Sequence, residues 1–313
     1  MTMQDTIGVD VSKDCLDACH AGASDHRPFS NDTSGLTALC RWVRERGDVL
    51  VVFEASGAYH RDLEQALARR GLPFAKVNPR QARRFAEAIG QVAKTDRVDA
   101  AILARMGVAL QLEPTPALPE HMSELQDLLV YRRGLVKDRT AAQARLKAAR
   151  PKLLRRLLAQ RLAQIERQIG SVDGAVRALV RADPDLRGRM DILVSIPGIS
   201  TVSATAILAD MPELGQMSGK QAAALAGLAP MSRQSGRWQG HERIQGGRSS
   251  VRRSLFMPAL SAIQHNSSAK AKFEQLVSDG KPRKLALTAI MRKLVVTANA
   301  LLRDGRKWTE EPA

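Results

Sequence analysis

One apolar run at residues 49–54, Val-Leu-Val-Val-Phe-Glu, restricts the fold of this chain more than any other segment. An apolar run of this length without alternation is typical of a strand that is buried on both faces. Residues 6–12 alternate instead, with Ile7, Val9 and Val11 on one face and polar or small residues on the other. The two segments therefore predict neighbouring parts of a sheet that helices cover.

The order of the remaining patterns in the first third of the chain supports this sheet. Residues 16–21 and 27–31 are predicted to continue the first strand as a meander, and residues 74–77 form a further short strand. Helices are predicted at 34–46, with Ser34 as N-cap and Gly47 as stop, and at 59–70, 79–89 and 96–110. Strands come first and then alternate with helices, which predicts a mixed α/β sheet with helices packed on it.

The middle of the chain has a helical pattern throughout. Pro114, Pro116 and Pro119 predict a linker, after which apolar residues recur every three or four positions from 121 to about 180. Pro151 interrupts this pattern, so we expect two long helices that form a hairpin or coiled coil. Dimerisation or spacing is the usual role of such a pair.

The last third is predicted to be mostly helical. Pro197-Gly198 forms a tight turn between two apolar helical segments, as in a helix-hairpin-helix element, although a plain helical corner explains it equally well. Ser218 and Gln221 form a capping box that opens a helix through residue 229. Residues 231–249 have no helical period and are expected to form a long loop, with helices following at 250–264 and 283–303.

Charge is distributed unevenly along the chain. Residues 1–113 are neutral overall, residues 114–186 carry +6 and residues 187–313 carry +10, within a total formal charge of +16. A basic surface of this size favours polyanions such as nucleic acid, although a GC-rich genome also produces arginine-rich proteins. We expect these three segments to be three domains.

The location of the protein is predicted from what the chain lacks. It has no run of about eighteen apolar residues and no signal-peptide pattern at its start, which predicts no membrane span and a cytoplasmic location. Three cysteines, an odd number, are expected to be reduced thiols.

Four carboxylates stand at positions where a metal site is expected. Asp10 lies on the first strand, Glu54 ends the apolar run, and Asp96 and Asp99 are three residues apart on one helical face. Acidic side chains gathered at strand ends are suited to two-metal phosphoryl transfer. The alternative for Asp96 and Asp99 is an N-cap and a first-turn acid, whereas Glu54 would be a partly buried charge without a partner.

Several motifs resemble a known family. Five segments of the chain resemble the DEDD insertion-sequence transposases. They are IGVDVSKD, VVFEASGAYH, KVNPRQARRFAEAIGQVAKTDRVDAAILA, LVSIPGISTVSATAILADM and AGLAPMSRQSGRWQGHERIQGGRSSVRRSL. These are related to Piv-type DNA invertases, and some members are recombinases guided by a bridge RNA. The resemblance runs from about residue 5 to 305. It implies a RuvC-like (RNase H-like) domain at 1–113, a helical coiled-coil dimerisation arm at 114–186 and a mostly α-helical transposase domain at 187–313.

The resemblance also implies roles for individual residues. Asp10, Glu54, Asp96 and Asp99 match the catalytic tetrad that binds Mg²⁺ or Mn²⁺, and Ser235 matches the nucleophile that forms a phosphoserine link to DNA. Without the resemblance, Ser235-Gly236 would be taken for an ordinary turn. A hydroxyl of this kind needs activation by a metal or base, and neighbouring arginines can neutralise the charge that develops. Phosphate contacts are expected from Arg233, Arg237, Arg243, Arg248, Arg252 and Arg253.

The implied function is the metal-dependent recombination that moves an insertion sequence. The implied partners are DNA at the element ends and target, a non-coding bridge RNA, and further copies of the chain in a homodimer or homotetramer, associated with the nucleoid. A composite site is implied, in which acids of one protomer meet the serine of another. The alternatives are a hydrolytic nuclease or Holliday-junction resolvase that uses the same acids, and a non-catalytic nucleic-acid-binding scaffold.

Overall fold

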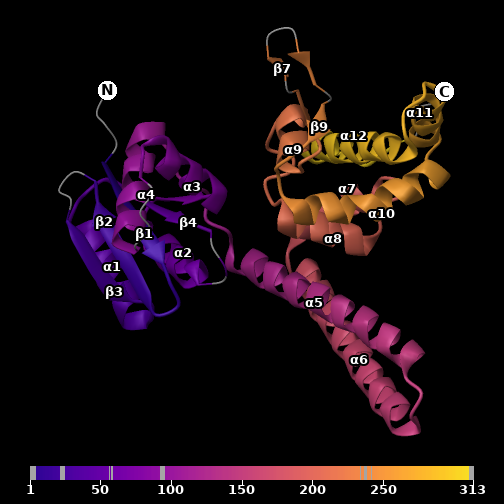
Figure 1. Ribbon diagram of the computed structural model, residues 1–313, viewed down its shortest axis with the longest axis horizontal. Helices are drawn as coiled ribbons and strands as arrows, with labels where there is room; N and C mark the ends of the chain where they lie inside the picture. Colours follow the sequence, from indigo (N-terminus) through magenta and orange to yellow (C-terminus); the bar gives the residue numbers. More distant parts are fainter. Residues whose placement is uncertain are drawn as a thin grey trace. The chain divides into compact units, whose positions relative to one another are not determined.

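The computed structural model describes residues 5–21, 25–55, 57, 59–91, 96–232, 234–235, 238–240 and 242–309 (Figure 1). The chain divides into two compact units, Met1–Leu118 and Pro119–Ala313. The first unit contains a five-stranded sheet and the second is mainly helical. The predicted combination of a mixed α/β sheet with a helical remainder is thereby confirmed, while the division into three domains stays a prediction.

The five-stranded sheet has the order β3-β2-β1-β4-β5. The first three strands form an antiparallel meander, and β4 and β5 run parallel to β1. All five predicted strands are present, each within one residue of the predicted bounds. They are β1 (Asp5–Val11), β2 (Cys15–His20), β3 (His26–Ser30), β4 (Val49–Glu54) and β5 (Phe74–Val77).

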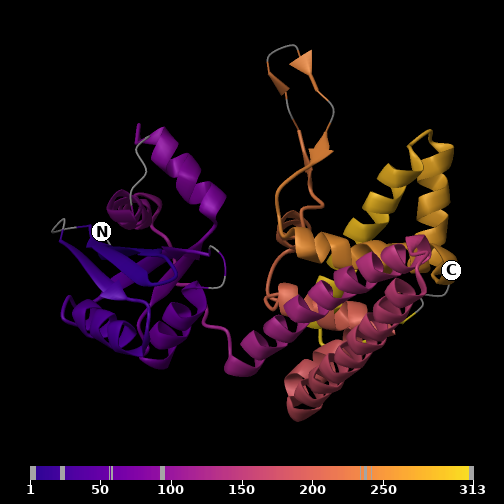
Figure 2. The ribbon, with the colours of Figure 1, turned by 60° about the horizontal axis from the view of Figure 1, so that its bottom comes forward.

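Helices cover both faces of this sheet. On one face, α1 (Thr33–Arg44) and α2 (His60–Arg69) pack against side chains that include Val51 and Phe53. On the other face, α3 (Pro79–Ala88) and α4 (Asp96–Leu110) pack against Leu50 and Val52 (Figure 2). Successive residues of β4 thus enter opposite cores, which confirms a strand buried on both faces.

The start of α1 differs from the prediction by two residues. Asp32, not Ser34, is the N-cap, and its side chain accepts a hydrogen bond from the Gly35 amide. The hydroxyl of Ser34 donates to the same carboxylate at 2.7 Å. Both residue types cap helices well, and the carboxylate of Asp32 also favours the positive end of the helix dipole.

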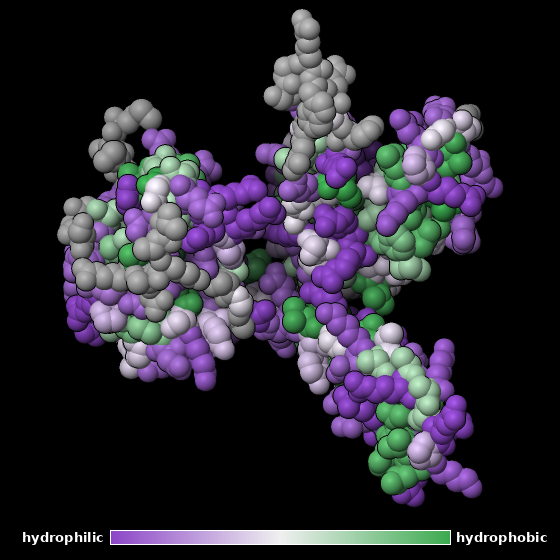
Figure 3. Space-filling view, in the orientation of Figure 1, coloured by the Kyte–Doolittle hydropathy of each residue, from purple (hydrophilic) through white to green (hydrophobic). Residues whose placement is uncertain are grey.

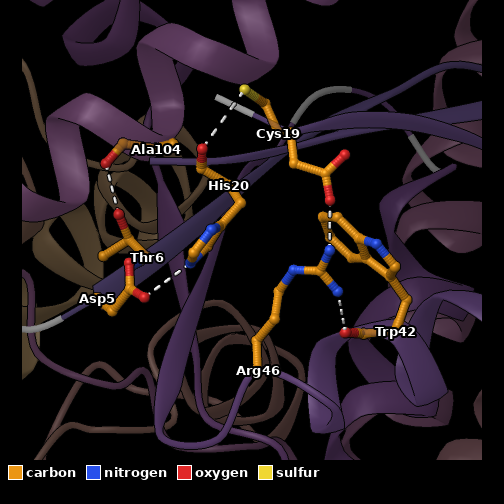
Figure 4. A network of polar contacts seen from close by, with 8 residues as sticks. Asp5, Thr6, Cys19, His20, Trp42, Arg46 and Ala104 are labelled. Atoms are coloured by element: carbon orange, nitrogen blue, oxygen red, sulfur yellow. Dashed lines mark hydrogen bonds and ion pairs between the residues drawn. The ribbon is translucent and has the colours of Figure 1, made fainter. Parts of the chain in front are cut away.

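Helix α4 lies directly against β1. A side chain on Gly8 would overlap the backbone of Ala100 and Ala104 and lie 2.9 Å from the Cβ of Leu103. The hydroxyl of Thr6 donates to the Ala104 carbonyl at 2.6 Å, and both residues are shown in Figure 4. The absence of a side chain at Gly8 is therefore what allows the helix to approach the strand so closely.

A polar network lies where β1 starts and β2 ends, at the other end of β1 from Asp10. Figure 4 shows His20 Nε2 facing Asp5, and their separation is 2.7 Å. In the same view Arg46 donates to the carbonyl of Trp42 and lies over its indole ring, 3.8 Å from the centroid. Arg46 also forms an ion pair with Asp25. These contacts hold the edge of the sheet that lies away from the acidic residues.

Two long helices begin the second unit, as predicted. They are α5 (Glu120–Ala148) and α6 (Lys152–Ala182), which contact one another along their length, and Pro151 is the N-cap of α6. Arg132 and Asp173 join them through an ion pair of 2.6 Å. We call this helix pair the arm.

The arm is fixed to the helices that follow it. Arg133 of α5 pairs with Asp210 at 2.7 Å, and Gln126 donates to the carbonyl of Ala209. Those partners belong to α8 (Thr201–Asp210), which follows α7 (Pro184–Ser195). Gly198, at φ +102°, makes the turn between the two helices, and a side chain there would lie 2.7 Å from the carbonyl oxygen of Pro258. The predicted turn is confirmed.

Helix α12 (Arg283–Arg303) is the core of the second unit. It packs against α7, α9 (Gly219–Leu225), α10 (Ser249–His265) and α11 (Ser267–Ser278). By length and composition it could cross a membrane, but half of its most apolar stretch is buried inside the protein, as in the core helix of a globular unit.

Three details here differ from the predictions. The capping box of Ser218 and Gln221 is present, but α9 ends at Leu225 instead of continuing to 229. Helix α11 was not predicted, and its start is capped by the side chain of Asn266. Residues 231–249 do not form one irregular loop, since short strands lie within it.

Candidate active site

Asp10 and Glu54 lie side by side because their strands are parallel and in register. Val9 of β1 pairs with Phe53 of β4, so the next residue of each strand reaches the same edge of the sheet. Both acids are partly exposed, whereas the residues before them are buried. The carboxyl ends of parallel strands are the usual place for a site in an α/β sheet.

Asp99 is brought to this edge by α4. The close approach of α4 to Gly8 places the first turns of the helix over the end of β1. Asp10, Glu54 and Asp99 consequently line one pocket of about 590 Å³, although Asp99 is separated from Asp10 by most of the unit's chain. The structure therefore gathers three of the four predicted acids.

Asp96 is the first residue of α4, one helical turn before Asp99. Its side chain lies outside the described part of the structure. Among the side chains that are described, no group of three His, Cys, Asp or Glu is close enough to hold one metal ion. Because the side chain of Asp96 is not described, the structure does not test the complete set of four acids, and their metal-binding role stays a prediction.

The pocket also contains an arginine that the sequence analysis did not single out. Arg83 of α3 lines it together with the apolar residues Val11, Ile102 and Leu103. Its side chain is half exposed and lies 3.3 Å from the carboxylate of Glu87. The only sequence signal is indirect: Asn78-Pro79 starts α3 at the end of β5, and Arg83 follows one turn later.

The predicted nucleophile is carried on a β-ribbon instead of a loop. Strand β6 (Pro230–Met231) pairs with β9 (Arg243–Ile244), and β7 (Gln234–Ser235) pairs with β8 (Trp238–Gln239). These are two separate two-stranded sheets, and both lie in the segment that projects from α9 and α10, which we call the ribbon (Figure 2). Ser235 pairs with Trp238, and the side chains of both residues lie outside the described structure.

The base of this ribbon is tightly packed. Gly227 and Gly247 both have positive φ and lie very close together. A side chain on either glycine would overlap the backbone of the segment that contains the other. Arg252 donates to the carbonyls of Gly227 and Gly246 at 3.2 and 3.1 Å. One guanidinium therefore joins the segment that enters the ribbon to the segment that leaves it.

The six arginines predicted to contact phosphate differ in their surroundings. Arg243 is exposed on β9, and Arg253 is exposed on α10 with a hydrogen bond to its own helix. Arg248 pairs with Glu213 at 2.6 Å and donates to the Asp210 carbonyl, so it supports the fold, as Arg252 does. Arg233 and Arg237 lie outside the described residues.

Comparison with known proteins gives matches for both the acidic pocket and the ribbon. A family model described as a transposase, the DEDD type of IS110, matches residues 7–154. A second model, described as the transposase IS116/IS110/IS902 family, matches residues 190–274. The first match spans the acidic pocket and the second spans the ribbon, in the order expected.

The chain belongs to the IS110 family of DEDD transposases.

Relatives agree with this assignment. The chain is 28% identical over 320 residues to the pilin gene-inverting proteins of Moraxella lacunata and Moraxella bovis, over 96% of this chain and 97% of theirs. It is 25% identical over 150 residues to a 43.6 kDa protein of insertion element IS110 from Streptomyces coelicolor, over 47% of this chain and 36% of that protein. This IS110 transposase is therefore an enzyme of DNA recombination, and its substrate is DNA.

The donors in the acidic pocket suit the metal chemistry of the family. DEDD transposases generally use divalent metal ions. Asp10, Glu54 and Asp99 offer only carboxylate oxygens, which are the ligands that hard divalent cations prefer. The lining thus fits a divalent cation in the kind of donor it provides.

Proposed function

We propose that this IS110 transposase cuts and rejoins DNA through Ser235, with Asp10, Glu54, Asp96 and Asp99 holding Mg²⁺ or Mn²⁺. The observation that carries the proposal is the gathering of Asp10, Glu54 and Asp99 around one pocket at the carboxyl edge of β1 and β4. The strand order and the antiparallel meander are also those expected of an RNase H-like domain.

The acids supply the electrostatic part of the reaction. A divalent ion bound there would neutralise charge on the phosphate oxygens during transfer. Asp10, Glu54 and Asp99 would hold this ion, and its charge would orient the scissile phosphate. Arg83, on the rim of the same pocket, adds a fixed positive charge that binds a phosphate oxygen of the substrate.

Ser235 supplies the covalent part. Its Oγ attacks a backbone phosphorus, so an Oγ–P bond forms and one P–O bond of the DNA strand breaks. The hydroxyl proton passes to a base and the departing strand oxygen takes up a proton, which leaves a hydroxyl end. Attack by a hydroxyl end of another strand reverses these steps and releases the serine, so no ATP is consumed.

The positioning of Ser235 favours this role. Its strand pair lies beyond β6 and β9 in the projecting ribbon, so it can reach DNA without unfolding the helices beneath. Arg243 is exposed on β9 of this ribbon, where its positive charge suits phosphate binding. Arg233 and Arg237 remain phosphate contacts predicted from the sequence. Arg253 stands on the exposed start of α10 and adds to that surface.

The proposed enzyme is a homodimer or homotetramer in which the acids of one protomer serve the serine of another. The arm supports this arrangement, since Leu153, Leu154 and Leu157 are about half exposed near its far end. Figure 3 shows an apolar surface in that part of the arm. Exposed leucines gathered in this way are typical of a protein–protein contact.

A guide RNA is the remaining part of the proposal. The resemblance implies a bridge RNA that pairs with donor and target DNA, and the net charge of +10 over residues 187–313 supports polyanion binding. We expect recombination to stop when the purified protein is stripped of RNA and to return when RNA transcribed from the element's flank is added. Recombination by RNA-free protein would remove the guide from the proposal.

Covalent trapping tests the central claim. Wild-type protein and the Ser235→Ala variant are incubated with DNA carrying an element end and a divalent metal, and are then separated on denaturing gels. We expect a DNA-linked chain with wild type and none with Ser235→Ala. Ser232→Ala, three residues away on the same ribbon, is the matched control and should still form the adduct.

The competing functions give different results in this assay. A hydrolytic nuclease or junction resolvase would release free DNA ends without any adduct in either protein. A non-catalytic scaffold would bind DNA equally well with chelator present and would not respond to Asp10→Asn. Either pattern would contradict the proposal.

Mixing variants tests the composite site. Ser235→Ala chains and Asp99→Asn chains are each expected to be inactive, and their mixture should recover part of the activity. If no mixing ratio restores strand cleavage, the acids and the serine of a single protomer act together.

A further inference from the structure

A second pocket of the first unit lies away from the acids. It has a volume of about 370 Å³ and is lined by the ends of α1 and α2. The last turn of α1 leads into the start of β4, and Arg70 follows α2 just before β5 begins. This pocket is therefore at the edge of the sheet where β4 and β5 start, whereas the acids are at the edge where they end. Its lining residues are Thr37, Cys40, Arg41, Arg44, Glu45 and Arg70.

Positive charge is concentrated here. The lining contains three guanidinium groups and one carboxylate, that of Glu45, in a unit that carries no net charge overall. In the described part of the chain, none of Arg41, Arg44 and Arg70 lies within ion-pair distance of an acidic side chain. Two of these arginines also act on Cys40, which lines the pocket. Burial raises the pKa of the Cys40 thiol, and the positive charges of Arg70 and Arg44 act against that rise.

Two of the three guanidinium groups, those of Arg44 and Arg70, donate hydrogen bonds to neutral partners. Arg70 donates to the hydroxyl of Thr37 at 3.1 Å and to the carbonyl of Ala66 at 3.2 Å. Arg44 donates to the carbonyl of Arg70, also at 3.2 Å. A guanidinium has five N–H donors, so both groups keep donors for a ligand while their position is already fixed. Ordering them on binding would consequently cost little entropy.

We propose that this pocket binds a phosphodiester group of the nucleic acid on which the transposase acts. Paired guanidinium donors match the oxygens of a phosphate, and a pocket with several such groups and a single carboxylate favours an anion. Because the pocket is remote from the acids, it holds the strand without taking part in cleavage. The ligand is the sugar-phosphate backbone of DNA or RNA, which share this chemistry. The inference rests on the proposed function only in its choice of ligand.

A purely structural role for these arginines has a different signature. Cations in the last turn of a helix stabilise it through the helix dipole, and Arg41 and Arg44 occupy that place in α1. In that case their removal would lower the melting temperature and leave nucleic-acid binding unchanged. Binding and stability must therefore be measured on the same variants.

The experiment uses the full chain with chelator present, so that binding is measured without cleavage. The variants are Arg41→Gln alone and Arg41→Gln combined with Arg44→Gln. The matched control is Arg105→Gln, which removes one exposed charge from α4 on the other face of the sheet. Affinity is measured over a series of salt concentrations with a DNA duplex of arbitrary sequence and, separately, with an RNA hairpin.

Loss of a phosphate contact lowers the slope of log affinity against log salt by about one for each arginine removed. We expect this change for Arg41→Gln and a larger one for the double variant, with DNA, RNA or both, and the responding probe identifies the ligand. If both variants keep the slope of Arg105→Gln with both probes, the inference is wrong. Because chelator is present, this result does not depend on whether Ser235 is the nucleophile.

Discussion

The acidic pocket and the β-ribbon are built in opposite ways. Asp10, Glu54 and Asp99 stand on elements whose other side chains fill two cores, one on each face of the sheet. The ribbon is held by two short strand pairs, and side chains such as Met231 and Ile244 are exposed. Charges that must share a cation need fixed distances, whereas a proposed nucleophile that must reach DNA benefits from standing outside the core.

The base of the ribbon differs from the rest of it because it is tightly packed. There Gly227, Gly246 and Gly247 bring two segments into backbone contact, and Arg252 bonds to both. The ribbon is therefore loosely supported along its length but firmly attached. We expect variants at the pocket, at the base and along the ribbon to fall into three classes of effect.

The largest effect is expected from Phe53→Ala. Phe53 is fully buried beside Glu54 and contacts the ring of Phe74, so its loss should destabilise the first unit by about 3–5 kcal/mol. Hydrogen exchange of peptides from β1 and β4 measures this. Ile244→Ala on the ribbon is the control and should change stability by less than about 0.5 kcal/mol. Equal effects would remove the distinction between the two regions.

Gly8→Ala should have the next largest effect. The added methyl group would push α4 away from β1, at a cost of about 3 kcal/mol, and separate Asp99 from Asp10. Gly134→Ala is the matched control, because that glycine lies within α5 with open space around it. This variant should be more stable than wild type by about 1 kcal/mol. Thermal unfolding compares the two, and a Gly8→Ala protein as stable as wild type would show that α4 moves freely.

Arg252→Ala tests the attachment of the ribbon. Loss of two hydrogen bonds from a charged donor should weaken the base by about 2 kcal/mol, with little change in the unfolding of the helices. Limited proteolysis between residues 230 and 244 should become faster. Arg253→Ala serves as control because its one bond is to its own helix. Similar cleavage rates in both variants would mean that the glycine contact alone holds the base.

The smallest effect concerns the N-cap of α1. The hydrogen bond from the Gly35 amide, followed by those from Ser34 and Ser30, lowers the pKa of Asp32 from 3.8 to about 2. Because the folded pKa is the lower one, the charged cap stabilises the protein above about pH 4, and this stabilisation is lost as the pH falls towards 2. Asp32→Asn keeps an acceptor without the charge.

The measurement for Asp32 is the difference in melting temperature between wild type and Asp32→Asn as a function of pH. We expect wild type to be the more stable protein at neutral pH and the difference to shrink on acidification. A constant difference between pH 6 and 2 would mean that the charge of Asp32 does not contribute.

The sequence by itself determined the elements that depend on neighbours along the chain. The apolar run at β4, the alternation in β1, the turn at Gly198 and the capping box of Ser218 were all predicted, since periodicity and caps act over a few residues. Helix α11 was missed because it is short and mostly polar, and its main start signal is the single side chain of Asn266.

Only the tertiary structure decided how distant residues meet. Asp10 and Asp99 share a pocket because a glycine in β1 admits α4, and Arg83 joins them through the placement of α3. The nested strand pairs around Ser235 and the use of Arg252 as a clamp depend on contacts between segments that the local pattern does not relate. Such contacts depend on shape and packing in three dimensions, which a one-dimensional period does not contain.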